Sequence, residues 1–309
     1  MPSAVSITHG LASDMNVAAL HSDRPILGQW MRVASILAFS GMALCVKLAA
    51  DDVPTGQIVF YRSFFAMIPL VGFLWLRGEF PNGLRTSRPL GHLMRCLAGC
   101  AAMFTAFASL RYLPLADYTL IGFLAPFATM ILARILLSEH VDARKWAGIG
   151  IGFAGVIALV WPELRLPGQR EGYLLGVALG IATAALTAVA KIQIRSLSRT
   201  ESAGAIAFYF ALTCTVVGAA TATLEWNVVD LTQLSALISA GILGGIAHIL
   251  MTLGIQFCPL SRQAGLDYLA LVFAVLLDVA VLAIVPDVWS LAATVLVLSA
   301  AWMSFRNRA

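Results

Sequence analysis

Apolar residues fill ten long segments of the chain, and polar residues are confined to the short stretches between them. Continuous apolar runs of this kind are typical of helices, whereas the strands of a membrane barrel alternate apolar and polar positions. A bilayer span needs about 20 mainly apolar residues, and its backbone groups must bond within the protein. The pattern predicts an all-α membrane protein of ten transmembrane helices. The segments are 28–49, 56–76, 91–110, 115–137, 145–161, 173–194, 204–223, 233–256, 261–284 and 289–305.

Composition supports a chain that is solvated by lipid. Of the 309 residues 60% are hydrophobic and 12% are charged, and the mean hydropathy is +0.87. Soluble domains carry about 25% charged residues, so this chain lacks the polar surface of a soluble globule. The net charge of +4 is spread over short clusters between apolar runs, which argues against nucleic-acid binding. Residues 1–27 lack the apolar run of a signal peptide, and we expect a disordered cytoplasmic tail there.

Lysine and arginine are distributed unequally between the two predicted sides of the membrane. If the N-terminus is cytoplasmic, thirteen of the 20 basic residues fall on the inside, three fall on the outside and four lie within spans. Cytoplasmic loops of membrane proteins carry the excess of basic residues. We therefore expect both the N-terminus and the C-terminus to be cytoplasmic.

The two halves of the chain share a pattern. Pro114 stands nine residues before a Phe-Leu-Ala run, and Pro259 stands nine residues before Tyr-Leu-Ala. Residues 60–62 (Phe-Tyr-Arg) likewise match residues 208–210 (Phe-Tyr-Phe). This predicts two five-helix repeats, and an odd number of helices inverts the second repeat in the membrane. Inverted repeats are typical of carriers that work by alternating access, with a site near the bilayer midplane.

Several of these runs resemble a known family. Residues 110–117, 123–126 and 137–139 resemble the EamA repeat of the drug/metabolite transporter superfamily. The resemblance implies a first EamA repeat over 28–162 and a second over 172–305, in a multi-pass protein of the bacterial inner membrane. More narrowly, residues 60–66 followed by 77–81 resemble the bacterial riboflavin transporters of this superfamily.

The resulting functional expectation is a secondary carrier for a small metabolite, with riboflavin uptake as the leading substrate and direction. Export of amino acids or amphipathic drugs is the alternative, and an intramembrane enzyme is a more remote one. The sequence contains neither a recognisable catalytic constellation nor a Walker loop. We therefore expect no enzymatic activity, no cofactor and no metal, with a gradient, such as that of protons, as the energy source. A homodimer is left open.

Ionisable and aromatic residues inside the spans are the candidates for the substrate site. A charge at mid-bilayer costs at least about 2.5–3.5 kcal/mol on insertion scales, so its presence indicates a use or a partner. Arg62 and His248 lie deep in the second and eighth spans, and Phe123 and Tyr268 occupy equivalent positions in the two repeats. We predict that these four residues contact the substrate. Simple packing is the alternative for His248 and the two aromatic residues.

Depth in the membrane suggests partners for the remaining charges. Asp278 falls in the same layer as Arg62, and Asp267 in the same layer as Lys191. We predict Arg62–Asp278 and Lys191–Asp267 pairs, in which Lys191, Asp267 and Asp278 act in gating or proton coupling. Static pairs that only help the helices insert are the alternative. Arg95 is near enough to the inner end of its span to extend to the interface.

Glycine patterns favour helix packing. Gly150-x-Gly152-x-x-Gly155 fits a dinucleotide-binding fingerprint as a string, but it lies in an apolar span with no strand before it. The pairs Gly176/Gly180 and Gly241/Gly245 have the small-residue spacing of close helix contacts in membranes.

Overall fold

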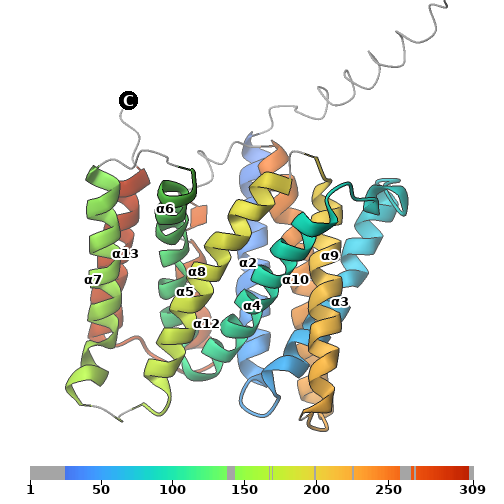
Figure 1. Ribbon diagram of the computed structural model, residues 1–309. Helices are drawn as coiled ribbons and strands as arrows, with labels where there is room; N and C mark the ends of the chain where they lie inside the picture. Colours follow the sequence, from blue (N-terminus) through green and yellow to red (C-terminus); the bar gives the residue numbers. More distant parts are fainter. Residues whose placement is uncertain are drawn as a thin grey trace, which may run out of the picture.

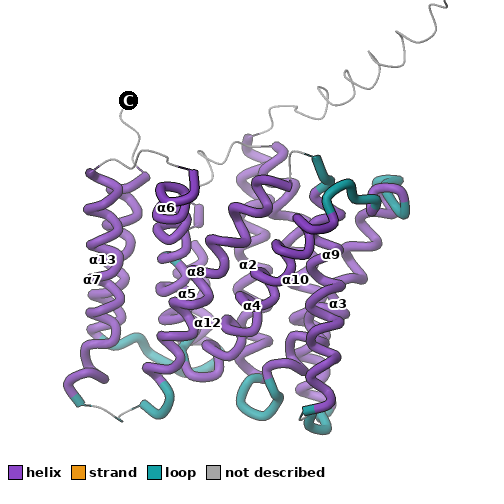
Figure 2. Tube along the Cα trace, in the orientation of Figure 1, coloured by secondary structure: helices purple, strands orange, loops and turns teal. Residues whose placement is uncertain are grey.

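Helices account for all the regular structure described. The structure is a computed structural model, and it describes residues 25–137, 143–166, 168, 170–197, 200–224, 226–257, 266–267 and 269–305. Figure 2 shows helices joined by short loops, and no strand occurs within these residues.

The observed helices agree closely with the predicted segments. Eight segments of the described chain are long and apolar enough to cross a membrane, and α12 and α13 are shorter. The described residues therefore support an all-helical multi-pass protein but show eight full spans rather than ten. The α-helices are α2 (Pro25–Ala49), α3 (Thr55–Leu76), α4 (Pro89–Tyr112), α5 (Leu115–Gly122), α6 (Leu124–Leu137), α7 (Ala143–Arg165), α8 (Tyr173–Leu197), α9 (Ala203–Ala220), α10 (Leu231–Phe257), α12 (Leu269–Ala280) and α13 (Val288–Phe305).

The fourth predicted span is divided into two helices. Pro126 has no N–H to give to the carbonyl of Gly122, so a continuous helix would leave that carbonyl unpaired. The helix accordingly ends at Gly122, and the Phe123 N–H bonds the Leu120 carbonyl at 3.1 Å in a tighter turn. The ninth predicted span is shorter than expected at its end. Its helix stops at Ala280 rather than at 284, and Ala283 has a positive φ of 55° before Pro286.

The helices form a bundle with two distinct ends. The end where α2 begins and α13 finishes is called the terminal face, and the other end the distal face (Figure 1). The α7–α13 pair lies at one edge of the bundle and the α3–α9 pair at the opposite edge (Figure 1). Between these edges α2 packs along α10, and α4 packs along α8.

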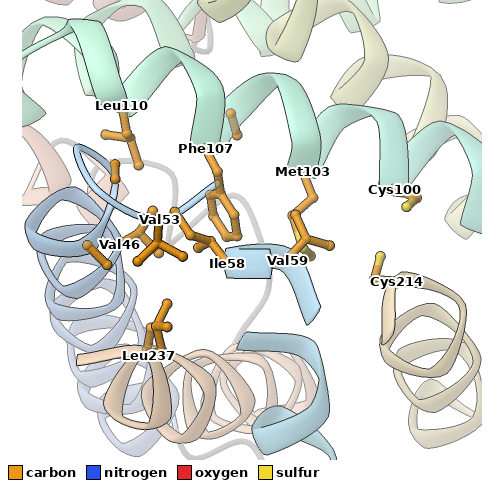
Figure 3. Close-up of a cluster of buried hydrophobic side chains, with 14 of the residues drawn as sticks. Val46, Val53, Ile58, Val59, Cys100, Met103, Phe107, Leu110, Cys214 and Leu237 are labelled. Carbon is orange, nitrogen blue, oxygen red and sulfur yellow. The ribbon is translucent and has the colours of Figure 1, made fainter. Parts of the chain in front are cut away.

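Two hydrophobic cores hold the bundle together. One core joins α2, α3, α4, α9 and α10, and it includes Val46, Ile58, Phe107 and Leu237. Figure 3 shows these side chains meeting from several helices. The other core joins α5, α6, α7, α8, α12 and α13.

Glycines allow the helices to approach closely, as their spacing predicted. A Cβ on Gly241 would lie 3.0 Å from the Arg62 carbonyl, and one on Gly245 would lie 2.8 Å from the Ala66 carbonyl, so α10 lies against the α3 backbone. Gly152, within the dinucleotide-like string, packs on the Phe127 ring. The string is therefore a packing feature within α7.

Candidate functional site

Arg62 lies in the interior of the bundle. It belongs to α3 and is only 3% exposed. Its Nη2 donates to Met42 Sδ at 3.5 Å, which is a weak acceptor, and its Nε has no hydrogen-bond partner. A Cβ on Gly244 would lie 2.9 Å from Nη2, so the absence of a side chain at Gly244 lets the guanidinium rest on α10.

A second buried guanidinium lies on α4, a helix that contacts α3. Arg95 on α4 is 6% exposed, and its Cζ lies 4.1 Å above the centre of the Phe210 ring of α9. Its Nε and Nη1 are without hydrogen-bond partners. The Phe210 ring also lies edge-on to His248 of α10, at 6.5 Å between ring centres, and His248 is within electrostatic range of both arginines. Arg62, Arg95, Phe210 and His248 are called the arginine cluster.

The structure corrects the expected snorkelling of Arg95. Its side chain turns into the protein and stacks on Phe210 instead of reaching the interface. The position of Arg95 near the end of its span predicts that the side chain reaches the interface. This position does not reveal which face of the helix the residue occupies. The aromatic partner on α9 comes from the other half of the chain, so no local pattern pointed to it.

The predicted Arg62–Asp278 pair is wrong. Asp278 of α12 is 1% exposed and accepts hydrogen bonds from the backbone N–H groups of Leu115 (3.0 Å) and Ala116 (2.7 Å). These two N–H groups open α5 and have no partner within that helix. The carboxylate therefore caps the start of α5, where it also favours the positive end of the helix dipole.

The predicted Lys191–Asp267 pair is replaced by another one. Arg32 of α2 binds Asp267, with Nη2 at 2.6 Å from Oδ1. Lys191 is exposed on α8, with Asp267 and Arg32 as charged neighbours. Phe123 is partly buried at the break between α5 and α6, against the second core. Tyr268 lies outside the described residues.

A cavity with several charged residues in its lining opens at the distal face. Its volume is about 360 Å³, and Lys47, Asp117, Arg170, Asp278 and Asp287 contribute to its lining. Sequence reasoning gave Asp117 no role, yet its carboxylate joins three helices. It accepts from Tyr173 Oη of α8 at 2.8 Å and from Ser290 Oγ of α13 at 2.9 Å.

The charged rim of this cavity is well compensated. Arg170 Nη2 lies 2.6 Å from Asp287 Oδ2, and the Ser290 N–H lies 2.7 Å from Asp287 Oδ1. Burial by itself would raise the pKa of Asp287, but these hydrogen bonds outweigh it and hold the pKa below its usual range. The charged groups of this cavity thus have ion-pair or hydrogen-bond partners, in contrast to the arginine cluster.

A polar clamp links two connections at the terminal face. Glu201 Oε1, in the connection between α8 and α9, accepts from Thr86 Oγ1 at 3.0 Å and from the Ser87 N–H and Oγ at 3.0 and 3.1 Å. His92 Nε2 lies 3.4 Å from the other carboxylate oxygen. The clamp, defined as Thr86, Ser87, His92 and Glu201, joins the α3–α4 loop to the α8–α9 connection. Within the described residues, no group of three His, Cys, Asp or Glu side chains is arranged to hold a metal ion.

This chain resembles known transporters. Residues 26–161 match the EamA-like transporter family. The chain is 25% identical over 266 residues to the S-adenosylmethionine uptake transporter of Rickettsia bellii. The aligned region covers 86% of this chain and 89% of that protein. It is 25% identical over 250 residues to the pseudopaline exporter CntI of Pseudomonas aeruginosa, covering 80% and 84%.

A solved crystal structure shares the fold. It superposes with a TM-score of 0.65 at 22% identity, over 89% of this chain and 95% of the other. The relatives named here are an importer and an exporter, and neither is a riboflavin transporter. The expectation of riboflavin uptake therefore has no support from them.

Proposed function

We propose that the chain is a transporter of the EamA-like family, whose model matches residues 26–161, and that it carries a small amino-acid-derived metabolite across a membrane. S-Adenosylmethionine is the substrate we propose first. The observation that carries this proposal is the similarity to S-adenosylmethionine uptake transporters along 86% of the chain. A family of transporters also agrees with the expected lack of enzymatic activity.

The packing of the helices supports alternating access between two inverted halves. If the two five-helix halves are equivalent, α2 corresponds to α8, and α10 corresponds to α4. The extensive α2–α10 contact then has its counterpart in the α8–α4 contact, while α3–α9 and α7–α13 each pair equivalent helices. This pattern is what a two-fold relation between the halves predicts.

Individual residues support the same relation. The spacing of 145 residues between Pro114 and Pro259 makes Gly99 equivalent to Gly244. Arg62 packs on Gly244, and its repeat counterpart Phe210 packs on Gly99, where an added Cβ would lie 2.9 Å from the ring. We infer that the arginine cluster lies between the two halves, where substrate sites of inverted-repeat carriers are found.

Riboflavin is the less suitable substrate on chemical grounds. It carries no charged group at neutral pH that would pair with two buried guanidiniums, whereas S-adenosylmethionine carries a carboxylate. The related exporter leaves the direction of transport open, so the test must not depend on direction.

Counterflow in proteoliposomes tests the substrate. Vesicles containing the purified chain are loaded with unlabelled S-adenosylmethionine and diluted into a trace of labelled compound. We expect accumulation several-fold above protein-free vesicles, with riboflavin, amino acids and amphipathic drugs tested in parallel. Counterflow of riboflavin alone would restore the vitamin as substrate. Counterflow of an amino acid alone would point to the amino-acid alternative, and counterflow of none would contradict every substrate tested.

A further inference from the structure

The arginine cluster contains two buried positive charges without a negative partner. Within the described part of the chain, neither Arg62 nor Arg95 forms an ion pair with a carboxylate. Their electrostatic neighbours are instead the thiols of Cys96 and Cys214 and the ring of His248. Three guanidinium nitrogens in this region have no hydrogen-bond partner.

A structural role does not account for this arrangement. Buried charges in proteins are normally paired or hydrogen-bonded, and Asp117 and Asp278 of this molecule each accept two hydrogen bonds. The arginines therefore destabilise the empty protein, and such residues within membrane spans commonly mark the path of a substrate or an ion.

The surroundings fit one planar anionic group. Arg62 projects from α3, Arg95 from α4, Phe210 from α9 and His248 from α10, so the cluster draws on both halves of the chain. A guanidinium presents its N–H donors in a planar fork that matches the two oxygens of a carboxylate. The Phe210 ring holds Arg95 from one side through a cation–π contact, which leaves Nε and Nη1 unpaired.

We propose that Arg62 and Arg95 bind the carboxylate of the transported metabolite, an inference that rests on the transport function proposed above. The bound carboxylate offsets one of the two positive charges and joins α3 to α4, whose arginines pack on Gly244 and Phe210 of the second half. Both guanidiniums are sealed from the surface here, so the substrate enters when the helices around the cluster separate.

Pairs of ligands that differ in the carboxylate test this proposal. S-Adenosylmethionine is compared with decarboxylated S-adenosylmethionine, and L-methionine with L-methioninamide, by equilibrium binding to the purified full-length protein. We expect each acid to bind about tenfold more tightly than its partner, the loss expected when a charge-assisted hydrogen bond is removed. Inorganic phosphate serves as a third probe and should bind weakly.

Substitutions assign the preference to the two arginines. Arg62→Gln and Arg95→Gln should each weaken the binding of S-adenosylmethionine and of L-methionine about tenfold. The binding of the two analogues that lack the carboxylate should not change. Arg62→Lys, which keeps the charge but loses the fork, should have a smaller effect. Arg111→Gln is the matched control, because Arg111 lies on the same helix as Arg95 but is exposed and bonds the Asp51 carbonyl. Its ligand preference should be that of the unmodified protein.

A ligand-free measurement separates binding from folding. The melting temperatures of Arg62→Gln and Arg95→Gln without ligand should equal or exceed that of the unmodified protein, because each substitution removes an unpaired buried charge. Lower melting temperatures, equal binding of acid and partner, tighter binding of phosphate, or no binding of any acid would overturn the site. Arginine-dependent binding of L-methionine without S-adenosylmethionine counterflow would instead refute only the proposed substrate. Counterflow without carboxylate preference would refute only the site.

Discussion

Single carboxylates at the ends of this bundle act mainly on loops and helix starts. Glu201 illustrates the point, because one of its oxygens accepts from Thr86 and Ser87 and the other lies 3.4 Å from His92 Nε2. Burial by itself would raise the pKa of Glu201, but the hydrogen bonds from the Ser87 N–H and from the Thr86 and Ser87 hydroxyls outweigh it. They hold the pKa below its usual range.

This lowered pKa predicts how stability depends on pH. A carboxyl whose pKa is lower in the folded state stabilises the protein when the pH is above the pKa of the unfolded state, which is about 4.3 for Glu. This stabilisation is lost as the pH falls through the pKa of the folded state. Glu201→Gln should therefore lower the melting temperature at pH 7 by about 2–4 °C. The difference from the unmodified protein should shrink as the pH falls below about 4.

The control for this prediction is Glu171→Gln, since Glu171 is exposed on the distal face. It should leave the melting temperature unchanged at every pH. A difference between Glu201→Gln and the unmodified protein that stays constant with pH would mean that the Glu201 charge does not hold the clamp.

The sequence correctly placed Arg62 and Asp278 in the interior of the bundle, but it did not predict their partners. Depth along a helix placed Arg62 and Asp278 in one layer, but depth says nothing about the direction in which each side chain points. Asp278 found its partners in the backbone N–H groups of Leu115 and Ala116. Every residue except proline has a backbone N–H, so the residue types at these two positions do not indicate that they bond Asp278.

At the scale of elements, helix contacts depend on glycines that face a neighbouring backbone. A Cβ on Gly218 of α9 would lie 2.7 Å from the Phe60 backbone N and 2.8 Å from its Cα, on α3. Backbone atoms cannot move aside as a flexible side chain can. Gly218→Ala must therefore push α3 and α9 apart, and these helices carry Arg62 and Phe210 of the arginine cluster.

Gly218→Ala should destabilise the protein by about 1–3 kcal/mol, the usual effect of inserting an extra carbon into a well-packed contact. Gly150→Ala is the matched control, because nothing lies within 4 Å of a Cβ built there. Alanine favours a helix over glycine by about 1 kcal/mol, so this control should be neutral or stabilising. Equal melting temperatures for the two variants in the same detergent would contradict a close α3–α9 contact.

Helix boundaries were predictable from the sequence because lipid imposes strong requirements on a span. Nine predicted segments begin within three residues of an observed helix, and Pro89, the first residue of α4, stands where proline is tolerated. Pro126 lies within the fourth predicted span, and the break in this span occurs at Gly122–Phe123, on the N-terminal side of the proline. A proline disturbs the carbonyl four residues earlier, so the break precedes it.

At the scale of the whole molecule, the two halves are interleaved. Helices α2 and α10 belong to different halves of the sequence yet pack along each other, as do α4 and α8. The repeat in the sequence indicated equivalent segments but not which of them touch. Packing between halves depends on residues that lie more than a hundred positions apart, such as Arg62 and Gly244.

The orientation of the bundle in the membrane is a separate property, and the distribution of charge predicts it. Loops at the terminal face carry Arg77, Arg85 and Arg88 between α3 and α4, whereas the distal loops 50–54 and 226–230 contain acidic residues and no lysine or arginine. Basic loops stay in the cytoplasm, so the terminal face should be cytoplasmic and the distal face should face outward.

Cysteine labelling in intact bacterial cells measures this orientation. Val228 is fully exposed in the distal loop, and Asn82 is exposed at the terminal face. A membrane-impermeant maleimide should label Val228→Cys in intact cells and Asn82→Cys only after permeabilisation, with the unmodified protein as the background. The opposite pattern would reverse the topology while leaving the fold intact. Labelling of both sites in intact cells would mean that the chain inserts in both orientations, in which case a single direction of transport would not apply.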